Sequence, residues 1–208
     1  MSEPERRRAQ HRPVLVWRRD VPWLAASSAA HGGGIGERSW VLNATVESGY
    51  QRDDPETHIG ELAAELGLRG RGIGLLTAVD VREAVTVREA GITATVTTGV
   101  SLPVWAASAE SSPAAAATSE RAGTINVVCL LPVRLSEGAL VNAVATVAEA
   151  KAQALFEAAL PGTGTCTDAT VLLCPMCGPA EAYGGPRSVL GAPLARCVRA
   201  AISAGLPR

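Results

Sequence analysis

The sequence has few aromatic residues and almost no lysine. Aromatic residues make up 3% of its 208 residues, as one Phe, two Tyr and four Trp, and Lys151 is the only lysine. The hydrophobic core must therefore be built from Ala, Val, Leu and Ile. A strong charge of one sign is also absent, because 19 Lys and Arg face 20 Asp and Glu, which leaves a formal net charge of −1. Such a balance gives no indication of binding to nucleic acid or to an anionic membrane.

Long apolar runs are absent as well. No stretch approaches the roughly 20 residues that span a bilayer, and the charged N-terminal segment lacks the apolar region of a secretory signal. We therefore expect a cytoplasmic protein without a membrane partner, and we predict that residues 1–12 are a disordered tail. Five cysteines are an odd number in a reducing compartment, so no disulfide framework is expected.

Cys174 and Cys177 form a CxxC motif, which no second cysteine pair and no His cluster accompanies. Its two interpretations are metal or redox chemistry and two small apolar residues at a strand end. A zinc site needs about four ligands. The missing ligands favour the second interpretation, and we predict no metal site.

Short apolar runs bounded by turn residues predict a protein rich in strands. The expected strands are residues 13–18, 23–30, 39–47, 72–79, 84–88, 92–99, 123–133 and 166–174. Periodicity favours three helices, over residues 56–67, 137–159 and 188–204. Gly67 closes the first helix, and Ser136 is the expected N-cap of the second. Because strands outnumber helices, we predict an α+β fold in which a mixed or antiparallel sheet with hairpins packs against about three helices.

Turn residues organise the rest of the chain. Glu89-Ala90-Gly91 separates two strand-like runs and predicts a hairpin with a three-residue connection. The glycine clusters at 32–36 and 67–74 lack the features of nucleotide-binding loops, so we interpret them as turns. Residues 13–208 are expected to form a single domain, with a low-complexity surface loop at 106–122.

The single lysine lies within the long predicted helix. Lys151 is four residues from both Val147 and Leu155, which belong to the apolar stripe of that helix. Two interpretations remain open. Either the stem packs while the amine reaches water, or a half-buried amine is directed at a carboxylate or a substrate carbonyl. Glu149 is two residues away and points elsewhere.

A polar turn follows this helix. Residues 162–169 (GTGTCTDA) place hydroxyls, glycines and a carboxylate at the entrance of an apolar strand. Such a set can polarise a carbonyl, activate a water or supply a Thr nucleophile, with Thr165 and Thr167 as the candidates. The alternative is a turn whose only task is to start the strand.

Asn43 and Asn126 lie within strand-like runs, where Asn is depleted. A buried amide without partners costs ~1–3 kcal/mol. Each Asn therefore either bonds a neighbouring loop or points into a site, and both outcomes stay open.

Six segments together resemble the adenosylcobinamide amidohydrolase family. They are WVLNATV (40–46), LLTAVDV (75–81), ITATVTTGVSLPVWA (92–106), GTINVV (123–128), EAKAQAL (149–155) and GTGTCTDATV (162–171). The resemblance implies a bacterial enzyme of corrinoid salvage. It would hydrolyse the amide between the aminopropanol arm and the corrin ring of adenosylcobinamide, which gives adenosylcobyric acid and 1-amino-2-propanol. The cobalt belongs to the substrate, and no cofactor is implied.

Amide hydrolysis assigns expected roles to these residues. Asp168 is the base for a water or orients a Thr hydroxyl, and Lys151 stabilises the oxyanion or protonates the leaving amine. Glu149 pairs with an Arg or a backbone N–H, with catalysis as its other option. Asn43 and Asn126 donate to the amide carbonyl or to peripheral amides of the corrin. Further substrate-binding positions are expected at Thr77, Thr98, Gly123, Thr124 and Gly164.

Two other classes of function remain open. One is a corrinoid-binding protein without catalysis, which has no need of a Lys–Asp pair. The other is a different amide hydrolase with an autocatalytic Thr nucleophile. The sequence also leaves open whether the chain forms a homo-oligomer.

Overall fold

The fold is known from a computed structural model, which describes residues 3–108 and 123–206. Its main strands are β1 (Glu5–Ala9), β2 (Arg12–Ser27), β3 (Gly34–Thr45), β4 (Gly72–Thr77), β5 (Val85–Glu89), β6 (Ile92–Thr98), β7 (Ile125–Leu130) and β9 (Ala169–Pro175). They form one eight-stranded sheet in the order β4-β3-β2-β9-β7-β6-β5, with β1 paired to β2. The β3/β4 and β7/β9 pairs are parallel and the others antiparallel, so the sheet is mixed.

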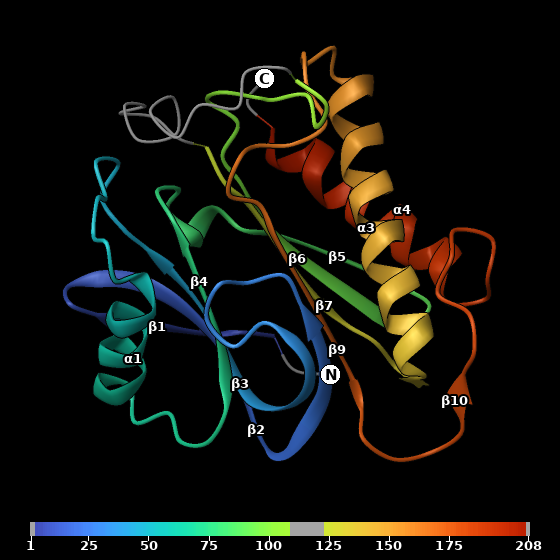
Figure 1. The fold of residues 1–208 in the computed structure, drawn as a ribbon, viewed down its shortest axis with the longest axis horizontal. Helices are drawn as coiled ribbons and strands as arrows, with labels where there is room; N and C mark the ends of the chain where they lie inside the picture. The colour runs from blue at the N-terminus through green and yellow to red at the C-terminus, as the bar shows by residue number, and fades with distance from the viewer. Residues whose placement is uncertain (1–2, 109–122, 207–208) are drawn as a thin grey trace.

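The helices described are α1 (Pro55–Glu65), α3 (Glu137–Glu157) and α4 (Gly191–Gly205), with a short 3₁₀ turn η1 (Val81–Glu83). β8 (Arg134–Leu135) and β10 (Ala180–Glu181) form a small parallel pair. Helices α3 and α4 lie together against one face of the sheet, and α1 lies at its other side (Figure 1). The predicted α+β class is confirmed, with element boundaries shifted by a few residues.

The N-terminal segment differs from the prediction. Glu5–Ala9 is not a disordered tail but a strand, which pairs antiparallel with the first half of β2. Gln10 and His11 adopt φ values of 46° and 64° in the turn between the two strands. Within β1 only Ala9 is fully buried. The strand therefore lacks the apolar alternation that sequence patterns detect, and its backbone pairing holds it in place.

Local turn chemistry explains where several elements end. Ser136 Oγ accepts a hydrogen bond from the Ala139 N–H at 3.2 Å, which confirms the predicted N-cap of α3. Gly67 follows α1 with a φ of 67°, and its N–H donates to the Ala64 carbonyl, as a helix-closing glycine does. The β5–β6 hairpin is present, but Glu89 pairs with Ile92, so its loop has two residues rather than three. The predicted loop at 106–122 lies outside the described residues from 109 onward.

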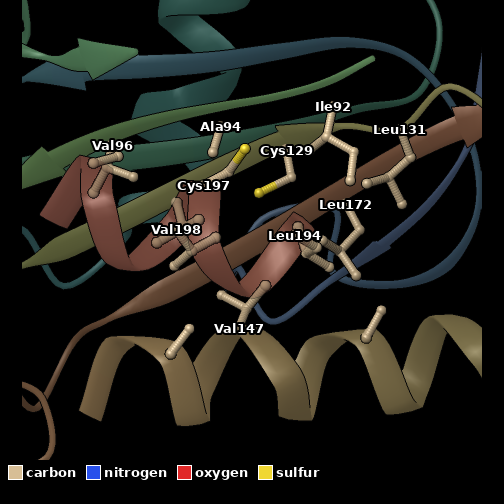
Figure 2. Close-up of a cluster of buried hydrophobic side chains, with 14 of the residues drawn as sticks. Ile92, Ala94, Val96, Cys129, Leu131, Val147, Leu172, Leu194, Cys197 and Val198 are labelled. Atoms are coloured by element: carbon tan, nitrogen blue, oxygen red, sulfur yellow. The ribbon is translucent and has the colours of Figure 1, made fainter. Parts of the chain in front are cut away.

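The core under α3 and α4 is aliphatic, as the shortage of aromatic residues requires. Figure 2 shows Cys129 of β7 and Leu172 of β9 facing Val147 of α3 and Val198 of α4. These four side chains are at most 1% exposed. This packing orients the face of α3 from which Lys151 extends.

A second core lies on the other face of the same strands. Val128 and Leu130 of β7 pack there with Trp17 of β2 and with Ile73 and Leu75 of β4. The length of β2 makes this possible, because its register with β3 shifts at a bulge and its second half pairs β9 as well. The sheet therefore bends back on itself, and β7 contacts β4 although three strands lie between them in the sheet order.

Candidate functional site

Lys151 and Asp168 form a half-buried ion pair at one end of the sheet. Lys151 Nζ lies 2.5 Å from Asp168 Oδ2, and the two side chains are 17% and 10% exposed. Lys151 stands beside Ala150 and Ala154, which pack into the core. The geometry is that of an amine directed at a carboxylate, which was one of the two interpretations of this lysine.

The position of Asp168 follows from strand alternation. It directly precedes β9, in which Leu172 and Cys174 face the helices. Asp168 therefore lies on the side of α3, where Lys151 reaches it. Its Oδ1 accepts from the Ile125 N–H at 2.8 Å and from the Thr165 hydroxyl at 2.5 Å. Its Oδ2 accepts from the Thr165 N–H at 2.9 Å in addition to Lys151.

Gly164 allows the loop backbone to lie against the ion pair. A Cβ built on this glycine would be 2.5 Å from both Lys151 Nζ and Asp168 Oδ2, too close for any side chain without movement of the pair. The Gly164 carbonyl accepts from the Val104 N–H at 2.8 Å, and the Thr163 N–H donates to the Val104 carbonyl at 2.8 Å. This bridge ties the segment around Val104 to the loop that carries the site.

Thr124, Thr167 and Gly123 lie next to Asp168, at the start of β7. The hydroxyls of Thr124 and Thr167 are 2.6 Å apart, and the Thr167 hydroxyl also donates to the Gly123 carbonyl at 3.3 Å. A Cβ on Gly123 would be 2.3 Å from the Gly99 carbonyl oxygen, so the end of β6 leaves room only for glycine here. Gly123 and Thr124 thus join the predicted hydroxyl-rich turn at 162–169, although Thr124 and Thr167 are 43 residues apart in sequence.

The two asparagines form a separate cluster. Asn126 Nδ2 donates to Asn43 Oδ1 and to the Leu76 carbonyl, each at 3.1 Å, and Asn43 Nδ2 donates to Thr97 Oγ1 at 3.1 Å. Asn43, Asn126 and Thr97 are each 1–2% exposed. Asn126 faces the second core, with Val128 and Leu130, so the sheet separates this cluster from the ion pair. Thr77 is also buried, and its hydroxyl accepts from the Val79 N–H at 3.2 Å.

Two further predicted site residues lie away from the ion pair. Glu149 is exposed on α3, and within the described residues its side chain has no hydrogen bond or ion pair. Thr98 has a buried hydroxyl without a hydrogen-bond partner among the described residues, and it lies against Gly205 near the end of α4. The structure therefore brings together Lys151, Asp168, Thr165, Thr167, Thr124, Gly123 and Gly164, but not Glu149, Thr98, Asn43, Asn126 or Thr77.

Sequence patterns missed a polar group around α1. His58 is 7% exposed, and its ring nitrogens lie 3.0 Å from the Tyr50 hydroxyl and 2.9 Å from Gln10 Oε1. Burial lowers the pKa of His58, because a desolvated imidazolium is disfavoured. The three side chains line a cavity of about 210 Å³ that does not include Lys151 or Asp168. Gln10 comes from the segment expected to be disordered, so no local pattern signalled this contact.

All five cysteines lie within the described residues. All five cysteines are free thiols; Cys174 is buried at the end of β9, where burial raises its pKa, and Cys177 is exposed. Among residues 3–108 and 123–206, no three His, Cys, Asp or Glu side chains gather in a way that would hold a metal ion. In the same part of the chain, no helix combines the length and apolarity needed to cross a membrane.

Comparisons with known proteins point to one family. The family described as "Adenosylcobinamide amidohydrolase" matches residues 1–208. A curated protein of that name from Methanosarcina mazei is 31% identical over 190 residues, which is 87% of this chain and 89% of the relative. Another of that name, from Halobacterium salinarum, is 31% identical over 189 residues, which is 88% of this chain and 79% of the relative.

Proposed function

The chain belongs to the adenosylcobinamide amidohydrolase family, and we propose that it hydrolyses the amide between the aminopropanol arm and the corrin ring of adenosylcobinamide. One water is consumed, and the products are adenosylcobyric acid and 1-amino-2-propanol. Membership in a family of amidohydrolases favours this enzyme over a corrinoid-binding protein without catalysis. The five free thiols are consistent with a cytoplasmic reaction. Both relatives are archaeal, so the bacterial source expected from the resemblance stays a prediction.

We infer the location of the reaction from one observation, the Lys151–Asp168 ion pair. Burying two charges has a desolvation cost that their attraction often fails to recover, so such a pair is a weak argument for stability. A lysine–carboxylate pair in contact with a hydroxyl is instead an arrangement that can serve chemistry. An ammonium has three N–H donors. Lys151 uses one on Asp168, and we assign the others to the carbonyl oxygen of the scissile amide and to the leaving amine.

Asp168 is best assigned to a Thr hydroxyl, which it orients and whose proton it can accept. Its carboxylate accepts four hydrogen bonds, which is about the number that two carboxylate oxygens accommodate. A catalytic water would have to displace one of these donors. This arrangement favours the orienter of a Thr hydroxyl over the base for a water, the two roles that the sequence left open.

Three exposed apolar side chains lie on the segment that is bridged to the loop of the ion pair. Leu102, Val104 and Trp105 are 53%, 39% and 54% exposed, and the Val104 backbone is bridged to Gly164. Trp105 is the one exposed residue of the four tryptophans. We propose that these side chains contact the substrate while its aminopropanol arm reaches Lys151.

The test is release of 1-amino-2-propanol from adenosylcobinamide by the purified chain. The wild type should turn over, and Asp168→Asn should lose on the order of 10²–10⁴ in kcat, because the amide cannot accept all four donors. Glu157→Gln is the matched control, since this α3 carboxylate is exposed and paired with Arg199. It should keep wild-type turnover. No release of the amine by the wild type would overturn the proposed function.

A further inference from the structure

Thr165 has a contact that no other hydroxyl of its loop has. Its Oγ1 lies 2.5 Å from Asp168 Oδ1, while its own N–H donates to Oδ2 of the same carboxylate. The Thr167 hydroxyl instead bonds Thr124 and a carbonyl oxygen, and the Thr163 hydroxyl accepts from the Ala106 N–H. Because an ionised carboxylate only accepts hydrogen bonds, the Thr165 proton points at Asp168. The lone pairs of Thr165 Oγ1 therefore point away from it.

A hydroxyl with its proton on a neighbouring base is the arrangement of an activated nucleophile. The second requirement is a third group that orients the base. Lys151 Nζ and the Ile125 N–H meet it, since they hold the two oxygens of Asp168 at 2.5 Å and 2.8 Å. Thr165 is 8% exposed, so it is largely shielded from bulk water before substrate binds.

We propose that Thr165 is the covalent nucleophile of this enzyme, an inference that rests on the proposed function. In the first step, Thr165 Oγ1 forms a bond to the amide carbonyl carbon, and its proton passes to Asp168. The C–N bond then breaks, and the leaving nitrogen takes a proton from the Lys151–Asp168 pair, so that 1-amino-2-propanol departs as the neutral amine. The enzyme retains an ester between Thr165 and the corrinoid acyl group.

The second step restores the hydroxyl. Water attacks the ester carbonyl, one of its protons returns through the pair to Thr165 Oγ1, and adenosylcobyric acid is released. Water is the only co-reactant, and nothing is oxidised or reduced. Lys151 stabilises the oxyanion in both steps, for which one well-placed donor is worth on the order of 10²–10³ in kcat.

Two substitutions at one position test the proposal. Thr165→Val keeps the shape but has no hydroxyl, and its kcat should fall by on the order of 10³ or more. Thr165→Ser keeps the hydroxyl and should retain at least a tenth of the wild-type kcat. Thr86→Val is the matched control, because it makes the same exchange on β5, where this hydroxyl bonds Thr95 and does not contact Asp168. It should stay within threefold of the wild type.

The covalent step has its own signature. With hydroxylamine present, the wild type and Thr165→Ser should convert part of the product to the corrinoid hydroxamate, because hydroxylamine competes with water for the ester. Thermal midpoints of unfolding would show that Thr165→Val folds. A folded Thr165→Val that keeps more than a hundredth of the wild-type kcat, or a Thr165→Ser as inactive as Thr165→Val, would overturn the covalent mechanism while the amide hydrolysis itself stands. A wild type without turnover would instead count against the proposed function.

Discussion

The ion pair and the asparagine cluster lie at the same end of the sheet but on opposite faces. Ile125 binds Asp168 through its N–H, and the next residue, Asn126, binds Asn43. The ion pair is charged and partly exposed, and Lys151 uses one of its three N–H donors on Asp168. The asparagine cluster is neutral, 1–2% exposed and bonded within itself. Polar residues at this end of the sheet thus serve two purposes, and solvent exposure distinguishes the group assigned to chemistry from the one that stabilises the bent sheet.

Among the substitutions that test this comparison, replacing Lys151 should have the largest effect. Lys151→Met keeps an unbranched apolar stem, so the fold should survive, with a lower thermal midpoint because the Asp168 carboxylate loses its cation. Loss of the oxyanion donor should reduce kcat on the order of 10²–10³, or about 2.7–4 kcal/mol. The measurement is steady-state release of 1-amino-2-propanol beside thermal unfolding. A Lys151→Met enzyme with wild-type kcat would remove the functional distinction between the two clusters.

Replacing Asn126 should act on stability instead. Asn126→Leu leaves the Asn43 amide oxygen and the Leu76 carbonyl without their donor, which costs about 1–3 kcal/mol of unfolding free energy. Turnover of the folded fraction should be unchanged. Urea denaturation and kcat, measured on the same sample, check both statements.

The double variant Asn43→Leu/Asn126→Leu sharpens this test. Because it removes both amides of the pair, it should recover part of the stability that Asn126→Leu loses. A loss of turnover in either variant at unchanged stability would assign the asparagines to substrate binding, as the sequence also allowed.

Gly164 tests the close approach of the loop to the ion pair. Gly164→Ala would place its Cβ against Lys151 Nζ and Asp168 Oδ2, which are the ends of flexible side chains and can move. We expect a folded protein whose kcat falls about ten-fold, because a small displacement of reacting groups is costly. Gly138→Ala is the control, since a Cβ there meets no atom within 4 Å. It should keep full activity, so a similar loss in both variants would contradict the interpretation.

The smallest expected effect is a slower alkylation of one cysteine when substrate is bound. Cys166 and Cys177 are both exposed, but only Cys166 lies in the turn that ends at Asp168. Bound adenosylcobinamide should slow alkylation of Cys166 severalfold and leave Cys177 unaffected. Mass spectrometry of the two peptides after brief alkylation measures both rates. Protection of Cys177 alone would place the substrate elsewhere.

Much of the ion pair was predictable from local pattern. Helical periodicity placed Lys151 beside the apolar stripe, and the short connection to the next strand brought Asp168 back toward it. The four hydrogen bonds of Asp168 were not predictable, because two of them depend on the exact path of the turn at Thr165 and one on the start of β7. Glu149 was included for its proximity in sequence, and the helix places it on the exposed side.

The asparagine cluster could not be predicted in the same way. Asn43 and Asn126 are 83 residues apart, and they meet only because β2 bends and the sheet turns back on itself. Burial of each was suggested by its strand-like run, but the partner was not. β1 was missed for a related reason, since its pairing with β2 involves backbone groups that leave no mark on side-chain pattern.

The Ile125 N–H has a consequence for how this site changes over evolution. It supplies one of the four hydrogen bonds to Asp168, yet every residue except proline carries the same group. Substitutions at position 125 therefore affect the packing of the core, where Ile125 is fully buried, and leave this backbone hydrogen bond in place. One hydrogen bond of the site therefore depends on the register of β7 and β9 and not on which amino acid stands at position 125. Mutations that shift this register would disable the enzyme while every reactive side chain remained in the sequence.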